Sequence, residues 1–305
     1  MDFAFNLYTF ALGLDRDRLT HQAFAFWLIL ATGGVVMYLT FASFSYFLFF
    51  RLRRKTYFPK TIDPDNEEEL RRQVRHEIWI AVCSIPCMGI LMMPAALFAH
   101  RGYSRQYKDV SEYGWLHFFL SPLYFFAFTD FMVYCFHRGL HHPVLYKHLH
   151  KLHHCYKYTT PFSSHAFNPC DGFGQGVPYY IYTYFFPLHS GLFMLLFVFV
   201  NFWTISIHDQ VDFGGHFLNT TGHHTIHHEL FNYDYGQYTT IWDRLGGTYK
   251  PAEQTHQFAS LTHLEDANYE DPVYRTYHEE KGFLAGRFKS EAEQHRREKT
   301  QKVAA

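Results

Sequence analysis

The residues of this chain best suited to chemistry are its histidines, which number 23 in 305 residues. Residues three or four apart share one face of a helix, so a group at this spacing presents its imidazoles in one direction. Neutral imidazole is a ligand for iron, zinc, copper and nickel. Eight histidines form one HxxxH and two HxxHH groups: His137, His141, His150, His153, His154, His224, His227 and His228. Eight nitrogens exceed the capacity of one ion, so the pattern predicts two ions with open coordination positions.

Other catalytic motifs are missing or incomplete. A soluble di-iron bundle takes a Glu-x-x-His motif from each of two helices, whereas only Glu253 and His256 have this spacing here. The sequence contains no HExxH, G-x-S-x-G, Walker A or G-x-G-x-x-G motif, and its five cysteines form no CxxC pair. We therefore expect no nicotinamide to bind to this chain, and its electrons to come from a partner.

Apolar segments must carry these histidines to one place. Residues 23–50 and 78–99 contain no charge, 115–136 contains one acid, Asp130, and 178–207 is interrupted at Pro187–His189. An uncharged helix of about 20 residues can cross a hydrocarbon layer of about 30 Å. We predict that the first three segments span a membrane, with kinks at Pro86 and Pro94 in the second. The fourth is expected to form two half-length helices that enter and return as a hairpin.

The distribution of basic residues predicts the orientation. The loop 51–77 holds more Lys and Arg than the other loops, and such loops lie in the cytoplasm. The third span then ends in the cytoplasm near His137. An odd number of membrane crossings between His137 and His208 would place the histidine groups on opposite sides of the membrane, about 30 Å apart. Because that is too far for a shared metal site, this argument supports the hairpin. The expected fold class is thus all-α: an integral membrane protein with about four hydrophobic segments and a cytosolic, histidine-rich helical cap.

Composition narrows the classes of partner. Aromatic residues reach 20%, with 34 Phe and 23 Tyr, as is typical of a surface in contact with a lipid bilayer. The formal charge of −1 gives no reason to expect nucleic acid. A soluble helical core is the alternative for the apolar segments, but four such blocks favour a membrane. The N-terminus has no basic region or cleavage site, so no removable signal peptide is expected.

In order and spacing, the histidine groups resemble the three histidine boxes of the fatty acid hydroxylase/sterol desaturase superfamily. Within it, four segments are similar to the C-5 sterol desaturases, also called lathosterol oxidases or Δ7-sterol 5(6)-desaturases. They are TPFSSHAFNPCDGFGQGVPYYIY (160–182), FPLH (186–189), VNFWTISIHDQ (200–210) and GHHTIHHELFNYDYGQYTTIWDRLGGTYKP (222–251). The resemblance covers residues 115–251, which we expect to form the catalytic domain. Residues 1–114 before it are expected to hold membrane spans and a cytosolic loop, and residues 252–305 after it a polar tail.

The resemblance implies a multi-pass oxidoreductase of sterol biosynthesis in the endoplasmic reticulum membrane, with its active site facing the cytosol. It implies two iron ions and O2 as cofactors, a Δ7-sterol substrate desaturated at C5–C6, and electrons from cytochrome b5 and an NAD(P)H-dependent reductase. The eight box histidines would be the iron ligands. His208 would be a ninth ligand, His165 a further ligand or a supporting group, and Asp209 or Asp130 would hold an imidazole in place. Asn168 stands where the family commonly has histidine, and an amide is not expected to replace it as a ligand.

Three other functions remain open at this point. A hydroxylase of fatty acyl or other lipid chains belongs to the same superfamily, a membrane metal transporter could use histidine clusters as transit sites, and a non-catalytic relative could bind sterol. The aromatic residues of 115–136 and 178–203 would either line a sterol cleft or face lipid. The tail segment 279–305 has mixed charge, which is typical of a solvated helix and also suits docking of an electron donor.

Overall fold

The computed structural model describes residues 2–53, 67–156, 158–212 and 214–252. The predicted polar tail, apart from Ala252, lies outside the described residues, as does its expected role in docking. The part of the chain that is described is mostly helical, and its two strands have two residues each, which confirms the all-α prediction.

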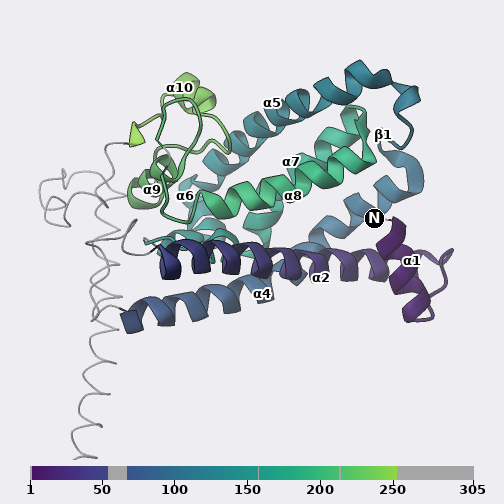
Figure 1. The fold of residues 1–305 in the computed structure, drawn as a ribbon, viewed down its shortest axis with the longest axis horizontal. Helices are drawn as coiled ribbons and strands as arrows, with labels where there is room; N and C mark the ends of the chain where they lie inside the picture. The colour runs from purple at the N-terminus through teal and green to yellow at the C-terminus, as the bar shows by residue number, and fades with distance from the viewer. Residues whose placement is uncertain (1, 54–66, 157, 213, 253–305) are drawn as a thin grey trace, which may run out of the picture. The chain divides into compact units, whose positions relative to one another are not determined.

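Long apolar helices form the body of the fold (Figure 1). Helix α1 (Asp2–Ala11) is followed by the long helices α2 (Leu19–Ser45), α4 (Glu67–Phe98) and α5 (Gly114–Leu140). Two of them continue into π-helical turns: α2 into η1 (Tyr46–Leu52) and α4 into η3 (Ala99–Tyr103). Three stretches are long and apolar enough to cross a membrane, namely Leu19–Leu52, Leu70–Tyr103 and Gly114–Leu140. The three predicted spans are therefore confirmed. The second helix begins well before the predicted residue 78, because its charged N-terminal turns continue the same helix outside the apolar segment.

The fourth apolar segment is a helical hairpin. Helix α7 (Pro169–Phe185) and helix α8 (Ser190–Ser206) are separated by a break that includes β2 (Leu188–His189). Strand β2 pairs in parallel with β1 (Gln106–Tyr107), which is followed by a short 3-10 turn, η4 (Val110–Glu112). The break lies at the predicted position, but each arm has 17 residues and is about 26 Å long. The arms are thus nearly as long as a hydrocarbon layer is thick, rather than half its thickness.

Close helix contacts hold this bundle together. A Cβ on Gly34 of α2 would lie 2.8 Å from Ile85 Cγ2 of α4, so only glycine permits this approach. The indole nitrogen of Trp27 donates to the carbonyl of Pro86 at 2.9 Å, inside α4, which continues through Pro86 and Pro94. The hydroxyl of Tyr184 in α7 donates to the carbonyl of Ala95 at 2.7 Å. These bonds use polar groups that would otherwise be unsatisfied among apolar neighbours.

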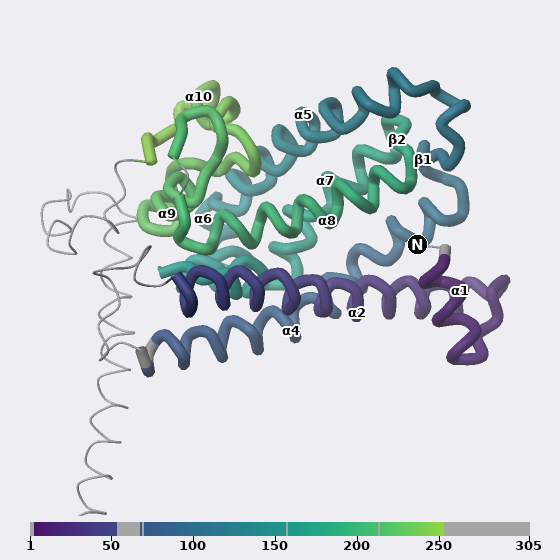
Figure 2. Tube along the Cα trace, viewed as in Figure 1, coloured from purple at the N-terminus to yellow at the C-terminus, as the bar shows by residue number. Residues whose placement is uncertain are grey.

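Short elements form a cap at one end of the bundle, away from β1 and β2 (Figure 2). They are α6 (Pro143–Leu145), η5 (Tyr146–His150), η6 (His153–Cys155), η7 (Ser163–His165), α9 (Thr221–Leu230) and α10 (Ile241–Gly246). The third long helix, α5, ends at this cap, and both arms of the hairpin meet it, α7 at its start and α8 at its end. The hairpin therefore returns the chain to the same end of the bundle, and the three histidine groups come together there.

Candidate metal centre

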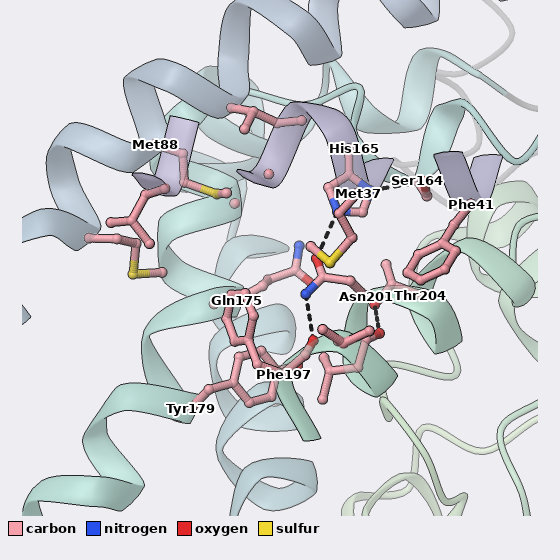
Figure 3. Close-up of a pocket in the computed structure, with 18 of the residues that line it drawn as sticks. Met37, Phe41, Met88, Ser164, His165, Gln175, Tyr179, Phe197, Asn201 and Thr204 are labelled. Carbon is pink, nitrogen blue, oxygen red and sulfur yellow. Dashed lines mark hydrogen bonds between the residues drawn. The ribbon is translucent and has the colours of Figure 1, made fainter. Parts of the chain in front are cut away.

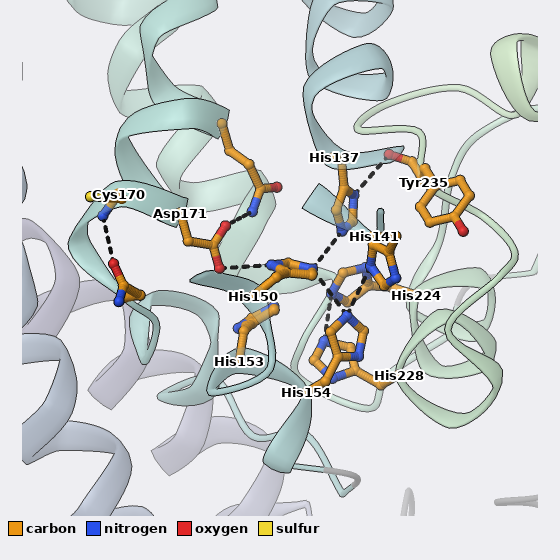
Figure 4. A network of polar contacts seen from close by, with 12 residues as sticks. His137, His141, His150, His153, His154, Cys170, Asp171, His224, His228 and Tyr235 are labelled. Atoms are coloured by element: carbon orange, nitrogen blue, oxygen red, sulfur yellow. Dashed lines mark hydrogen bonds and ion pairs between the residues drawn. The ribbon is translucent and has the colours of Figure 1, made fainter. Parts of the chain in front are cut away.

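Nine imidazoles gather in the cap and form two groups, and within each group the potential ligand atoms all lie within 4.8 Å of one another. Figure 4 shows several of them converging, including His137, His150 and His154. The first group, which we call cage 1, consists of His137, His141, His150, His154 and His227. The second, cage 2, consists of His153, His208, His224 and His228. The structure thus brings together all eight histidines of the three sequence groups and adds His208, which follows α8.

Each HxxHH group is divided between the cages. The i, i+4 pairs 150/154 and 224/228 each stay in one cage, whereas His153 and His227, at i+3, belong to the opposite cage from their neighbours. The sequence prediction that each group faces one way is therefore wrong in this detail. Successive helical residues project about 100° apart, so positions i+3 and i+4 diverge enough to reach two neighbouring ions. Cage 1 also receives the HxxxH pair from the end of α5.

Four imidazoles have their Nδ1–H bound by an acceptor outside the cages. The acceptors are the carbonyls of Tyr235 for His137 (3.0 Å), Thr204 for His208 (2.6 Å) and Tyr233 for His227 (2.7 Å), and the carboxylate of Asp171 for His150 (2.7 Å). A neutral imidazole carries one proton, so the Nε2 atom of each of these rings presents a lone pair. These four acceptors therefore fix both the tautomer and the direction of each ring.

The Nε2 atoms of the cages lie close together, at distances that fit shared cations. Nε2 of His150 lies 3.2 Å from that of His137 and 3.0 Å from that of His154, and in cage 2 the Nε2 atoms of His208 and His224 are 2.9 Å apart. His137 and His150 both present lone pairs, so neither can donate to the other. Nitrogens about 2.1 Å from one ion and at right angles lie about 3 Å apart. The residues present therefore fit two transition-metal ions, with five and four nitrogen donors.

Burial keeps several of the cage imidazoles neutral. Desolvation, with a further contribution from neighbouring imidazoles, holds the pKa of His153, His154 and His224 well below the usual range. For His208, burial lowers the pKa to about 3. Because protons do not compete for these nitrogens near neutral pH, each can act as a metal ligand.

His165 lies outside both cages, and Asn168 is a helix cap. The Nε2 of His165 lies 3.1 Å from the side-chain oxygen of Asn201, and its Nδ1 lies 3.0 Å from the hydroxyl of Ser164. The side-chain oxygen of Asn168 accepts a hydrogen bond from the backbone N–H of Cys170 at 2.9 Å, as an N-cap residue of α7 does. Asparagine at this position therefore has a structural role, which is to cap the N-terminus of α7.

The carboxylate that contacts a cage imidazole belongs to Asp171, which the sequence analysis did not single out. The chain has three acids between residues 130 and 209, and Asp171, in the first turn of α7, bonds His150. Asp209 accepts instead from the hydroxyl of Ser45 at 3.2 Å and from the backbone of Val211 at 3.0 Å. Asp130 accepts from the backbone N–H groups of residues 237–239. Nothing in the spacing of these acids separates the three roles.

We expect Asp171→Asn to weaken metal retention by about tenfold to a hundredfold, since supporting partners of metal-bound histidines have effects of this size. The neutral amide is a weaker acceptor for the Nδ1–H of His150, so that ring loses basicity and a fixed direction. Metal remaining after dialysis against graded chelator concentrations measures the effect. Asp109→Asn, on the exposed loop near β1, is the control. Unchanged retention in both Asp171→Asn and Asp171→Ala would contradict this role.

A cavity of about 480 Å³ lies beside the cages, between α2, α4, α7 and α8 (Figure 3). Four of its lining residues belong to the cages: His137, His153, His208 and His224. Its size is in the range of pockets for small organic ligands. Tyr179, Tyr180, Phe193 and Phe197 line it, as expected for the segment 178–203, but no residue of 115–136 does. Aromatic residues of α5 such as Trp115 and Phe119 are exposed instead, on the surface of a helix long enough to span a membrane.

Comparisons with known proteins identify relatives of this chain. The family model described as fatty acid hydroxylase matches residues 122–248. The chain is 41% identical to rat lathosterol oxidase (Rattus norvegicus) over 81% of this chain and 82% of the relative. It is 39% identical to a Δ(7)-sterol 5(6)-desaturase of Schizosaccharomyces pombe over 86% of this chain and 84% of the relative. A probable Δ(7)-sterol 5(6)-desaturase of Neurospora crassa is 44% identical over 77% of this chain and 66% of the relative. No solved structure matches the chain.

Proposed function

The chain belongs to the fatty acid hydroxylase family of membrane oxidoreductases, and we propose that it is a Δ7-sterol 5(6)-desaturase. The reaction removes one hydrogen from each of C5 and C6 of a Δ7-sterol. With two electrons and two protons, it reduces O2 to two molecules of water. Cytochrome b5 and its NAD(P)H-dependent reductase would supply the electrons, because the sequence contains no nicotinamide-binding motif.

The observation that carries this proposal is that two metal cages open onto an apolar cavity. No side chain can remove hydrogen from an unactivated carbon, so two iron ions with O2 would supply the oxidant. The nine histidines would hold the ions, and the apolar walls exclude water from the reacting carbons. With five and four donors, the ions would keep coordination positions free for O2.

The cavity also suits a substrate that arrives from the bilayer. Val36 of α2 and Met194 and Val198 of α8 line the cavity and are also 37% to 64% exposed. These residues mark an opening between the two helices, on surfaces that face lipid in a membrane. A rigid, almost wholly apolar sterol can enter there sideways without crossing water.

The absence of charge in the cavity argues against a free fatty acid or an acyl thioester of coenzyme A. Among the described residues, those that line the cavity include no Lys or Arg. A buried carboxylate or phosphate without a cationic partner costs several kcal/mol. A neutral substrate such as a sterol alcohol avoids this cost. The hydroxylase alternative therefore requires a neutral lipid or a head group outside the cavity.

We place the cap in the cytosol of a cell and the chain in the endoplasmic reticulum membrane. The end of α2 and the start of α4 lie at the cap end of the bundle. Arg51 lies in η1, which extends α2, Arg53 follows η1, and Arg71, Arg72 and Arg75 lie near the start of α4. Basic residues next to membrane spans favour the cytoplasmic side. This orientation puts both cages within reach of electron donors in the cytosol.

Microsomes that contain the full chain, supplied with a Δ7-sterol, NADH and O2, are expected to produce the conjugated Δ5,7-diene. Sterol extracts separated by gas chromatography and mass spectrometry measure the product. Incubation without O2 is the control, and it should yield none. A 2-hydroxy fatty acid in place of the diene would establish the hydroxylase instead. Metal uptake into liposomes without O2 consumption would establish a transporter.

A further inference from the structure

The polar side chains that line the cavity are gathered at the end next to the cages. On α8, Asn201 and Thr204 are three residues apart and share a face, and His208 follows four residues later, just after the helix ends. The earlier turns of the same face carry Phe193 and Phe197. Thus the helix changes from apolar to polar as it approaches cage 2.

The other walls of the cavity also change from apolar to polar side chains toward the cages. Thr40 near the end of α2, Gln175 near the start of α7, and Ser164 and His165 in η7 are polar and lie toward the cap. Figure 3 shows His165, Gln175, Asn201 and Thr204 gathered close together, with Met88 apart from them. Residues farther from the cap on these helices, including Ile29, Leu30 and Met92, are apolar. Such a cavity fits an amphiphile with a small, neutral polar group directed at the cages.

Asn201 has a fixed orientation and an amide proton to spare. Its Nδ2 donates to the carbonyl of Phe197 at 2.7 Å, which identifies the other side-chain atom, 3.1 Å from His165 Nε2, as the oxygen. His165 Nε2 therefore carries the proton and donates it to this oxygen. The hydroxyl of Ser164 lies 3.0 Å from His165 Nδ1 and donates to the carbonyl of Pro161 at 2.7 Å. Because an amide nitrogen has two protons, one N–H of Asn201 remains for a ligand in the cavity that this residue lines.

Gln237 offers the complementary acceptor. Its backbone N–H is held by Asp130 at 3.2 Å, its carbonyl accepts from the indole of Trp203 at 2.7 Å, and its Nε2 donates to the hydroxyl of Thr204 at 2.9 Å. Within the part of the chain that the structure describes, its Oε1 accepts no hydrogen bond. The side chain lines the cavity beside Thr204, one turn along α8 from Asn201.

We propose that Asn201 and Gln237 bind the hydroxyl group of the substrate sterol, Asn201 donating to its oxygen and Gln237 Oε1 accepting its proton. This inference rests on the proposed function and adds the orientation of the substrate. In a sterol the hydroxyl carbon is two bonds from C5. A hydroxyl held at the polar end therefore keeps C5 and C6 beside the cages and leaves the apolar tail toward Phe193. Asn201 and Gln237 are thus positioning residues that select alcohols.

The test compares two probes, cholest-7-en-3β-ol and cholest-7-ene, which differ only in the hydroxyl group. Iron-loaded full chain in lipid nanodiscs is titrated with each probe in competition with a fluorescent sterol, and turnover is measured separately. The wild type should prefer the alcohol by about tenfold to a hundredfold, which corresponds to two hydrogen bonds. Asn201→Leu and Gln237→Met should each reduce this preference at least severalfold, mainly by weakening binding of the alcohol. Bound iron should not change.

Met37→Leu, which alters an apolar lining residue, is the matched control and should keep the full preference. Gln237→Met keeps both backbone hydrogen bonds of Gln237, so it remains informative if Asn201→Leu fails to fold. Equal losses of affinity for both probes would show a structural role only and would overturn the inference. So would an unchanged preference in both variants. A wild type that prefers the alcohol but forms no diene would refute the proposed reaction and leave the hydroxyl site supported.

Discussion

His150→Ala combined with His227→Ala is expected to leave about one iron ion per chain, whereas His150→Ala combined with His153→Ala is expected to leave none. The first pair comes from two different sequence groups but lies in cage 1. The second pair comes from one HxxHH group but is divided between the cages. The retained iron therefore reports which histidines share an ion, and iron analysis of the purified protein measures it.

All of these variants should lose more than a hundredfold in desaturase activity, because loss of a ligand exceeds the tenfold to hundredfold effect of losing a supporting partner. The single variants His153→Ala and His227→Ala should each lower bound iron as well. His148→Ala is the matched control, since His148 lies in the same segment but is exposed. His295→Ala, in the tail, should also change neither iron nor activity. Equal iron in the two double variants would refute the crossed arrangement.

The spacing of the histidines was enough to predict which side chains gather, but not how they divide. Positions i, i+3 and i+4 predict a shared face, and all eight residues do lie in the cages. The same division occurs in the π-helical and 3-10 turns at His150 and His153 and in the regular helix α9, so it depends on what surrounds each imidazole rather than on the spacing. His208 joins cage 2 because α8 ends beside α9, which is a property of tertiary packing.

The long-range polar contacts of the buried acids could not be predicted from the sequence for a similar reason. Asp130, Asp171 and Asp209 are all buried acids near apolar segments, and only their neighbours across the fold distinguish them. The hairpin, in contrast, was predictable because Pro187 breaks an otherwise continuous apolar run and the histidine groups require a return. The contribution of α2 and α4 to the cavity could not be predicted, since its walls combine residues of four helices from Ile29 in α2 to Thr204 in α8.

Asp130→Ala is expected to destabilise the protein by about 2–5 kcal/mol, because it leaves several buried donors without an acceptor. Asp130 is buried in α5, and its Oδ1 accepts from the backbone N–H groups of Tyr238 at 2.7 Å, Gln237 at 3.2 Å and Thr239 at 3.4 Å. Its Oδ2 accepts from the hydroxyl of Thr239 at 2.5 Å. One carboxylate thus fixes three consecutive residues of the loop.

The same loop reaches both parts of the site, so the effect on activity should also be large. The carbonyl of Tyr235 accepts from His137 in cage 1, and the side chain of Gln237 lines the cavity. Asp243 accepts from the backbone N–H groups of Tyr235 and Gly236, both at 2.8 Å, and secures the other end of this segment. Without Asp130, the loop is held at one end only, and we expect activity to fall about a hundredfold or more through misplacement of His137 and the substrate.

Thermal unfolding in detergent, iron content and diene formation together test this expectation. Ser121→Ala is the matched control, because Ser121 is buried in the same helix and its hydroxyl donates only to the carbonyl of Phe118. Asp130→Asn keeps an acceptor oxygen and should fall between Ala and the wild type in stability. If Asp130→Ala unfolds at the wild-type temperature and forms diene at the wild-type rate, the loop does not depend on this carboxylate. In that case the geometry of cage 1 must be set by α5 and the histidines alone.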